Sequence, residues 1–192
     1  MNQLLLQNFK CFRDQTIPFS DLTVFCGKNG SGKSTAIQAL LLHKVARECA
    51  ARGIEEVPLN CPPGLALGTV SDITPRELGG EEKRADQITI RFDFEGQAIT
   101  ARLETANIAE EANYILISNV SPRRKRLIDR PWQFVFLSAE RVGPRLTQES
   151  LSNVADSQLT IGEYGENLAE VVARFERRKI GKGLVHPSER SM

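Results

Sequence analysis

The chain has 192 residues, of which 41% are apolar and 26% are charged, and its net charge is +1. This composition excludes wholesale disorder, and the balanced charge excludes a global field that would attract nucleic acid or a membrane surface. No apolar run reaches the ~18 residues of a membrane span, and no basic-then-apolar leader opens the chain, so we expect a cytoplasmic protein without a membrane partner.

Three short apolar segments come before residue 27. Residues 2–12 read as a strand, Thr16–Phe19 as a second short segment, and Leu22–Cys26 as a buried strand. In a simple doubly wound fold a phosphate-binding loop commonly follows the first strand. The additional segments therefore predict a small antiparallel β element beside the main sheet.

Residues 27–34 read G-K-N-G-S-G-K-S, which fits the phosphate-loop pattern G-x-x-x-x-G-K-[ST]. Glycines let the backbone curl until successive N–H groups point at one phosphate. Lys33 would supply a cation for the β- and γ-phosphates, and the Ser34 hydroxyl would ligate Mg²⁺. The alternative is a glycine-rich turn that only resembles such a cradle. The predicted nucleotide-binding positions in this run are Gly27, Lys28, Asn29, Gly30, Ser31, Gly32, Lys33 and Ser34.

A helix is predicted from Lys33 to about Arg52, with Gly53 as its stop. Its dipole would face the phosphates. His43 on this helix is interpreted as a packing or surface residue rather than a ligand. The residues expected to face the sheet recur at helical spacing and are Ile37, Leu40, Leu41 and Val45.

Prolines and glycines across residues 58–86 forbid long helices or strands. Residues 87–94 and 97–104 then alternate with period two around Glu95-Gly96, which predicts a β-hairpin with one buried face. This hairpin also accounts for the D-x-x-G-Q run at residues 93–97, which mimics a motif of small GTPases. The chain has no N-K-x-D motif to accompany it. A further strand is expected within residues 113–118.

Later in the chain, Trp132–Ser138 predicts an apolar, central strand, and Asn167–Arg178 an amphipathic helix with Leu168 and Val172 on its apolar face. A basic cluster within residues 123–130 is either a contact for nucleic-acid phosphates or a solvated loop. The four cysteines show no C-x-x-C spacing, so we expect free buried thiols and no zinc site. They are Cys11, Cys26, Cys49 and Cys61.

Residues 4–40 resemble the opening of RecF/SMC-type ABC ATPases, which begin with an N-F-[KR]-[SC]-[FH] signature and continue to G-x-N-G-S-G-K-S-T. The first part is matched by Asn8, Phe9, Lys10 and Phe12, and the second by Gly27 and residues 29–35. The resemblance implies that Thr35 meets the α-phosphate, although a threonine at a helix start often only caps it. It also places Lys10 and Arg13 near the nucleotide; the alternative is a solvated strand end.

Residues 136–145 resemble an S-A-E-R-x-G-P-R stretch of prokaryotic AAA family ATPases related to OLD proteins. Many of these ATPases, including that of Septu, belong to anti-phage defence systems. Glu140 in this stretch follows the predicted strand, so it would lie at the carboxyl edge of a sheet, where ligands bind. It is either a catalytic residue that positions water or serves Mg²⁺, or a structural partner of Arg141 or Arg145.

The expected fold is therefore an α/β P-loop NTPase of ABC type, seen as an N-terminal lobe with a mixed β-sheet and an antiparallel β element, and incomplete. Residues 1–192 would be the N-terminal portion of one domain. Its expected parts are 1–57 (strands, loop and helix), 58–86 (irregular), 87–138 (β-rich) and 139–192 (mainly helical, with a truncated end).

The resemblance implies binding of ATP and Mg²⁺, with ATP-driven dimerisation and hydrolysis in a complete protein that serves DNA repair or anti-phage defence. The partner would be a second copy or the missing C-terminal half. No signature motif, Asp-Glu strand or switch histidine is found here, so we expect little or no turnover from this chain alone. Two alternatives are a non-catalytic, nucleotide-dependent assembly subunit and a kinase-like phosphate-loop enzyme.

Overall fold

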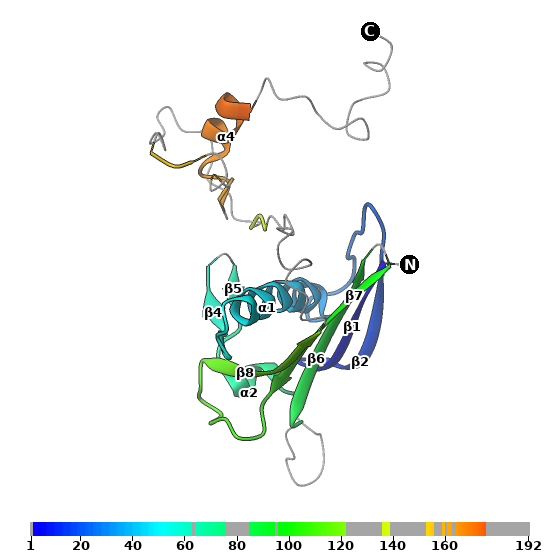
Figure 1. Ribbon diagram of the computed structural model, residues 1–192. Coiled ribbons are helices and arrows are strands. Elements are labelled where there is room, and N and C mark those ends of the chain that lie inside the picture. The colour runs from blue at the N-terminus through cyan, green and yellow to red at the C-terminus, as the bar shows by residue number, and fades with distance from the viewer. Residues whose placement is uncertain are drawn as a thin grey trace. The chain divides into compact units, whose positions relative to one another are not determined.

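The computed structural model describes residues 2–62, 64–75, 85–94, 96–121, 136–138, 153–155, 159, 161–162 and 164–175. The chain divides into two compact units, Met1–Gln133 and Phe134–Met192. The first unit contains a sheet and a long helix, α1 (Figure 1). In the second unit the described helix is α4, Leu168–Phe175.

The main sheet of the first unit has six strands in the order β2-β1-β6-β7-β8-β3. Its strands are β1 (Asn2–Phe9), β2 (Phe12–Phe19), β3 (Glu56–Pro58), β6 (Gln87–Phe94), β7 (Gln97–Glu104) and β8 (Tyr114–Ser121). All pairs of neighbouring strands in this sheet are antiparallel. The prediction of a mixed sheet is therefore wrong for the described residues. The tight turns that join β1 to β2 and β6 to β7 can connect only antiparallel neighbours.

The predicted hairpin is confirmed, because β6 and β7 pair along their whole length from Gln87↔Glu104 to Phe94↔Gln97. The expected strand near residues 113–118 is also present as β8, which runs on to Ser121. In the turn between β6 and β7, Gly96 has φ +77°, a conformation that glycine adopts without strain. The D-x-x-G-Q run is thus part of a hairpin, as expected.

In the described part of the irregular segment, residues 58–62, 64–75 and 85–86, the elements are short. They are β4 (Asn60–Cys61), β5 (Leu65–Ala66) and the helix α2 (Val70–Ile73). The Asp72 carboxylate accepts hydrogen bonds from the backbone N–H of Thr69 at 2.8 Å and from its hydroxyl at 3.0 Å. This capping box makes the single turn of α2 a defined structure in a segment rich in proline and glycine.

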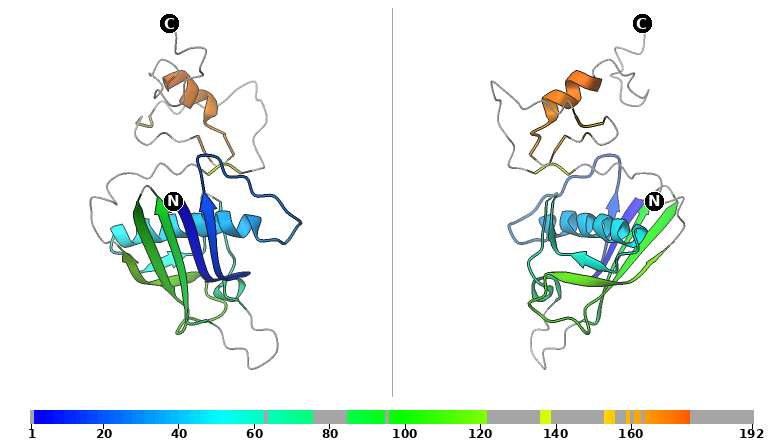
Figure 2. Two further views of the ribbon diagram at one scale, coloured as in Figure 1. Left: turned by 90° about the vertical axis from the view of Figure 1, so that its right-hand side faces the viewer. Right: turned by 60° about the vertical axis from the view of Figure 1, so that its left-hand side comes forward.

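Helix α1 spans Lys33–Ala51, which confirms the predicted element, and crosses one face of the sheet (Figure 2). Leu40 and Leu41 are buried as expected, but Ile37 is 38% exposed. The buried side also contains Ala36 and Ala39. The helix is therefore turned toward its small residues, whose short side chains allow closer packing on the sheet.

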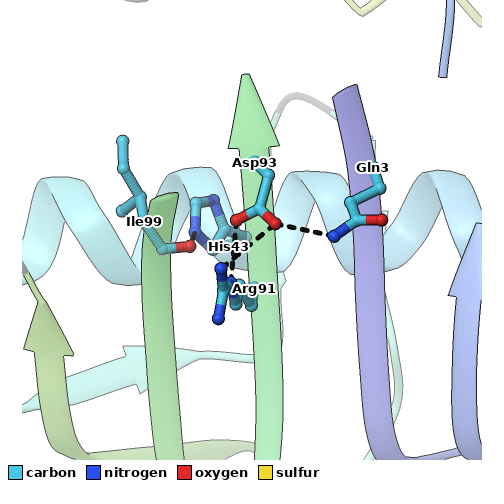
Figure 3. A network of polar contacts seen from close by, with 5 residues as sticks. All are labelled: Gln3, His43, Arg91, Asp93 and Ile99. Atoms are coloured by element: carbon cyan, nitrogen blue, oxygen red, sulfur yellow. Dashed lines mark hydrogen bonds and ion pairs between the residues drawn. The ribbon is translucent and has the colours of Figure 1, made fainter. Parts of the chain in front are cut away.

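The sheet face under α1 is apolar and the opposite face is polar. On the apolar side the fully buried strand residues include Leu4, Leu6, Ile88, Ile90 and Leu103. On the polar side Asp93 accepts hydrogen bonds from Gln3 Nε2 at 2.8 Å and from Arg91 Nε at 2.7 Å (Figure 3). The hydrogen bond from Arg91 is the main reason that the pKa of Asp93 lies below its usual value.

His43 lies in the core between α1 and the sheet, which confirms a packing role over a surface or ligand role. It is fully buried, and its Nε2 lies 3.1 Å from the backbone carbonyl of Ile99 on β7 (Figure 3). Because a carbonyl only accepts, the neutral imidazole carries its proton on Nε2. Burial lowers the pKa of His43 to about 4, and the nearby Arg47 adds to this effect.

This pKa predicts a pH-dependent stability. An imidazole in the unfolded chain titrates near 6.5, so between pH 6.5 and 4 the unfolded state binds a proton that the folded state does not. The free energy of unfolding therefore has its full value above pH 6.5 and decreases as the pH drops, by about 2 kcal/mol at pH 5. Urea unfolding at pH 7 and pH 5 measures it. The variant His43→Gln, which cannot titrate, should lose most of this dependence; an equal loss in both proteins would contradict the assignment.

The prediction that Leu22–Cys26 forms a buried strand is wrong. No strand is present there, and Leu22 and Val24 are 80% and 70% exposed. An interior strand needs hydrogen-bonded neighbours, and no described segment pairs with these residues. Residues 136–138, the described end of the other predicted core strand, are also outside any strand; 132–135 lie outside the described residues.

The remaining sequence predictions meet mixed outcomes. The amphipathic helix is confirmed over α4, although Leu168 and Val172 are about half exposed. All four cysteines are free as predicted, but their burial is wrong, since Cys11 and Cys26 are exposed and the other two are half-buried. Across the part of the chain described here, no helix has both the length and the apolar character needed to cross a membrane.

Candidate nucleotide-binding site

The glycine loop lies between residues 22–26, which form no helix or strand, and helix α1. Gly30 and Gly32 have φ values of +82° and +87°, in the left-handed region that L side chains rarely adopt. The backbone N–H of Ser31 donates to the carbonyl of Lys28 at 3.3 Å, which closes a tight turn inside the loop. The loop therefore has the strongly curved backbone that its glycines permit.

Lys33 holds the two ends of this loop together. Its ammonium donates to the carbonyls of Gly27 at 2.8 Å and Lys28 at 2.6 Å, and lies 3.4 Å from the Ser31 hydroxyl oxygen. A compact cation with three donors suits this arrangement. The Lys33 ammonium thus joins the end of the loop to its first two carbonyls and keeps a positive charge beside the loop backbone.

The N-terminus of α1 adds a second positive feature. Its N-cap is Gly32, no side chain caps the helix, and its first turn has no acidic residue. The first N–H groups of a helix lack intrahelical acceptors and carry the positive end of its dipole, equivalent to roughly half a charge. In the first turn Ser34 is exposed and Thr35 is half-buried. Because Gly32 is the N-cap, the alternative that Thr35 only caps the helix is wrong.

The turn between β1 and β2, residues 10 and 11, brings Lys10 to the side of α1. Its ammonium donates to Gln38 Oε1 at 3.0 Å, and its backbone N–H donates to the carbonyl of Ile73 at 2.7 Å. Partial burial lowers the pKa of Lys10. Arg13 is exposed on β2. Lys10 is thus packed against α1, where its partner Gln38 lies one helical turn after Ser34. Arg13, in contrast, lies at the surface.

Sequence reasoning missed a contact between this turn and the loop. A Cβ atom placed on Gly32 would lie 2.8 Å from Phe12 Cζ and 3.1 Å from Cys11 Sγ. The loop backbone therefore packs directly on these two side chains. The aromatic position of the N-F-K-C-F signature was a signal for such a contact, but nothing in the spacing indicated its partner.

Other candidate residues fall elsewhere. Glu140 and the basic cluster at residues 123–130 lie outside the described residues. Within the described ranges, no group of three or more His, Cys, Asp or Glu side chains could hold a metal ion.

The loop, α1 and the six-stranded sheet all lie in the part of the chain that matches a known family. The family described as AAA ATPase domain matches residues 1–132 of the 192. No curated protein and no solved structure matches the chain. The match covers the phosphate-loop pattern and more than half of the chain. The chain therefore belongs to the family of AAA ATPase domains.

Proposed function

We propose that residues 27–35 bind ATP with Mg²⁺. The observation that carries this proposal is the curved glycine loop, closed around the Lys33 ammonium at the uncapped start of α1. Membership of a family of ATPase domains supports it. Both features favour an anion at the same place, and a triphosphate is the anion that a phosphate loop binds.

Different groups of the loop and of α1 would bind different parts of the ligand. The backbone N–H groups of the loop would hold the phosphates, Lys33 would face the β- and γ-phosphates, and the exposed Ser34 hydroxyl would reach Mg²⁺. Thr35 would meet the α-phosphate. We assign Lys10 and Arg13 to the side of the nucleotide, as the resemblance to RecF/SMC-type ATPases implies. When bound, Mg²⁺ neutralises part of the triphosphate charge.

We further propose that the chain is the N-terminal portion of an ABC-type ATPase domain that acts with a second copy or with a C-terminal half. The exposed apolar side chains of Leu22 and Val24, next to the loop, support a covering partner. Glu140 is proposed as its water-positioning residue. The proposed service in DNA repair or anti-phage defence rests on the resemblance of residues 136–145.

Calorimetric titration with ATP·Mg²⁺ and GTP·Mg²⁺ tests the central proposal. We expect saturable binding of ATP and weaker binding of GTP, because the proposed relatives use adenine nucleotides. Absence of binding by either nucleotide to a folded chain would refute the proposal. Equal binding of both would retain the phosphate site and remove the adenine preference.

A second test uses the two exposed thiols beside the loop. Cys11 contacts the Gly32 position and Cys26 directly precedes Gly27, so bound nucleotide should slow their alkylation several-fold. Burial raises the pKa of Cys49 and of Cys61, so these two thiols react slowly with or without nucleotide. Mass spectrometry after timed alkylation measures all four. Unchanged rates at Cys11 and Cys26 under saturating nucleotide would argue against binding at this loop.

A further inference from the structure

The contact of the β1–β2 turn with the loop is specific to one glycine. A Cβ on Gly32 would approach Phe12 Cζ to 2.8 Å, a distance that real Cβ atoms do not show, whereas a Cβ on Gly30 would meet nothing within 4 Å. The ring of Phe12 thus lies against the loop backbone where it enters helix α1. A Cβ on Gly27, the first glycine of the loop, would meet Ser31 and not Phe12.

The turn that presents Phe12 is held from outside the loop. Its Lys10 N–H donates to Ile73 of α2, its Lys10 ammonium donates to Gln38 of α1, and Phe9 pairs with Phe12 at the end of the hairpin. Lys10 also has φ +50°, which is unfavourable for a side chain of its kind. Such a conformation persists only where the surroundings impose it, so the turn is a fixed support.

We propose that Phe12 is a positioning residue for nucleotide binding, which acts by holding Gly32 in its left-handed conformation at the start of α1. The inference rests on the proposed function, and it assigns Phe12 a contact with the loop rather than with the nucleotide. A loop held in its binding shape has less conformational freedom to lose when the phosphate arrives, so affinity rises without a new contact. Through Lys10, the same support links the loop to α2.

The test compares Phe12→Ala, Phe12→Leu and a control, Tyr114→Leu. Tyr114 is an aromatic residue on β8, which lies next to the edge strand β3, at the opposite edge of the sheet from β2. We expect Phe12→Ala to weaken ATP·Mg²⁺ binding by about tenfold. Phe12→Leu should recover most of the affinity, because leucine still fills the contact, and the control should bind like the wild type.

Amide hydrogen exchange in the full chain without nucleotide supplies an independent readout. In Phe12→Ala, the amides of residues 28–33 should exchange faster, while those of β7 keep their wild-type rates. Exchange at the wild-type rate in the loop would overturn the inference. If the wild type does not bind ATP, the proposed function fails, and the exchange result still decides whether Phe12 holds the loop.

A double-mutant cycle with Gly32→Ala tests the contact itself. In the wild type the added methyl group meets the Phe12 ring and Cys11 Sγ and is also strained by its backbone angle, whereas with Phe12→Ala the contact with Cys11 and the strain remain. Gly32→Ala should therefore change the amide exchange rates of residues 28–33 less when Phe12 is already alanine than when Phe12 is present. Additive effects would contradict the contact. Should Phe12→Ala fail to fold, the same cycle is run with Phe12→Leu.

Discussion

Replacing Lys33 with alanine should weaken the binding of ATP·Mg²⁺ by roughly 10- to 150-fold. The estimate corresponds to one charge-assisted hydrogen bond, about 1.5–3 kcal/mol. The Lys33 ammonium is bound to two loop carbonyls at 2.8 and 2.6 Å, so it lies inside the loop that would hold the phosphates. Its loss removes both the positive charge and the bonds that join the two ends of the loop.

Isothermal titration of wild type and Lys33→Ala measures the effect. Lys44→Ala is the matched control, because Lys44 is on the same helix and pairs with Glu48 at 3.3 Å rather than with the loop. The control loses an equal charge, so a general electrostatic effect on a triphosphate would weaken both variants alike. Similar affinities in Lys33→Ala and the wild type would show that the loop is not the phosphate site.

Replacing Phe9 with alanine should lower the free energy of unfolding by about 3–5 kcal/mol. Phe9 is fully buried at the end of β1, and its removal leaves a cavity between the sheet and its covering elements. Because a domain of this size is stable by only ~5–15 kcal/mol, the variant should be partly unfolded at 37 °C. The signature phenylalanine would then serve the core, in contrast to Phe12, which serves the loop.

Urea unfolding followed by circular dichroism measures this loss. Phe94→Ala is the control, because Phe94 is 41% exposed and its ring stacks on Phe92 at 5.9 Å. We expect it to cost about 1 kcal/mol, near the value of an aromatic pair. If Phe9→Ala is no more destabilised than Phe94→Ala, the position of Phe9 in the core is wrong.

Where a pattern depends on neighbours in the chain, the sequence predicted the structure. The alternation in residues 87–104 identified β6 and β7 with their turn, and the run after Lys33 identified α1 with its end near Gly53. The loop at residues 27–32 was also predicted as strongly curved, since its glycines allow positive φ angles. These are local properties of the backbone and of side-chain periodicity.

The failures concern burial and strand partners. Leu22–Cys26 has the composition of an inner strand, yet an apolar run becomes a buried strand only where other strands lie beside it. Ile37 fits the helical periodicity as well as Leu41 does, but the packing of small residues on the sheet turned it outward. Cys11 and Cys26 are exposed for a similar reason, since their surroundings come from distant parts of the chain.

By itself, the sequence determined that this chain contains a phosphate-type loop at the start of a helix, because eight consecutive residues carry that information. Only the tertiary structure decided that Phe12 and Cys11 pack on Gly32, and that Lys10 is bound between Gln38 and Ile73. Those contacts join residues from 20 to more than 60 positions apart. They form because the sheet and α1 must bury their apolar faces together, and that requirement acts through space rather than along the chain.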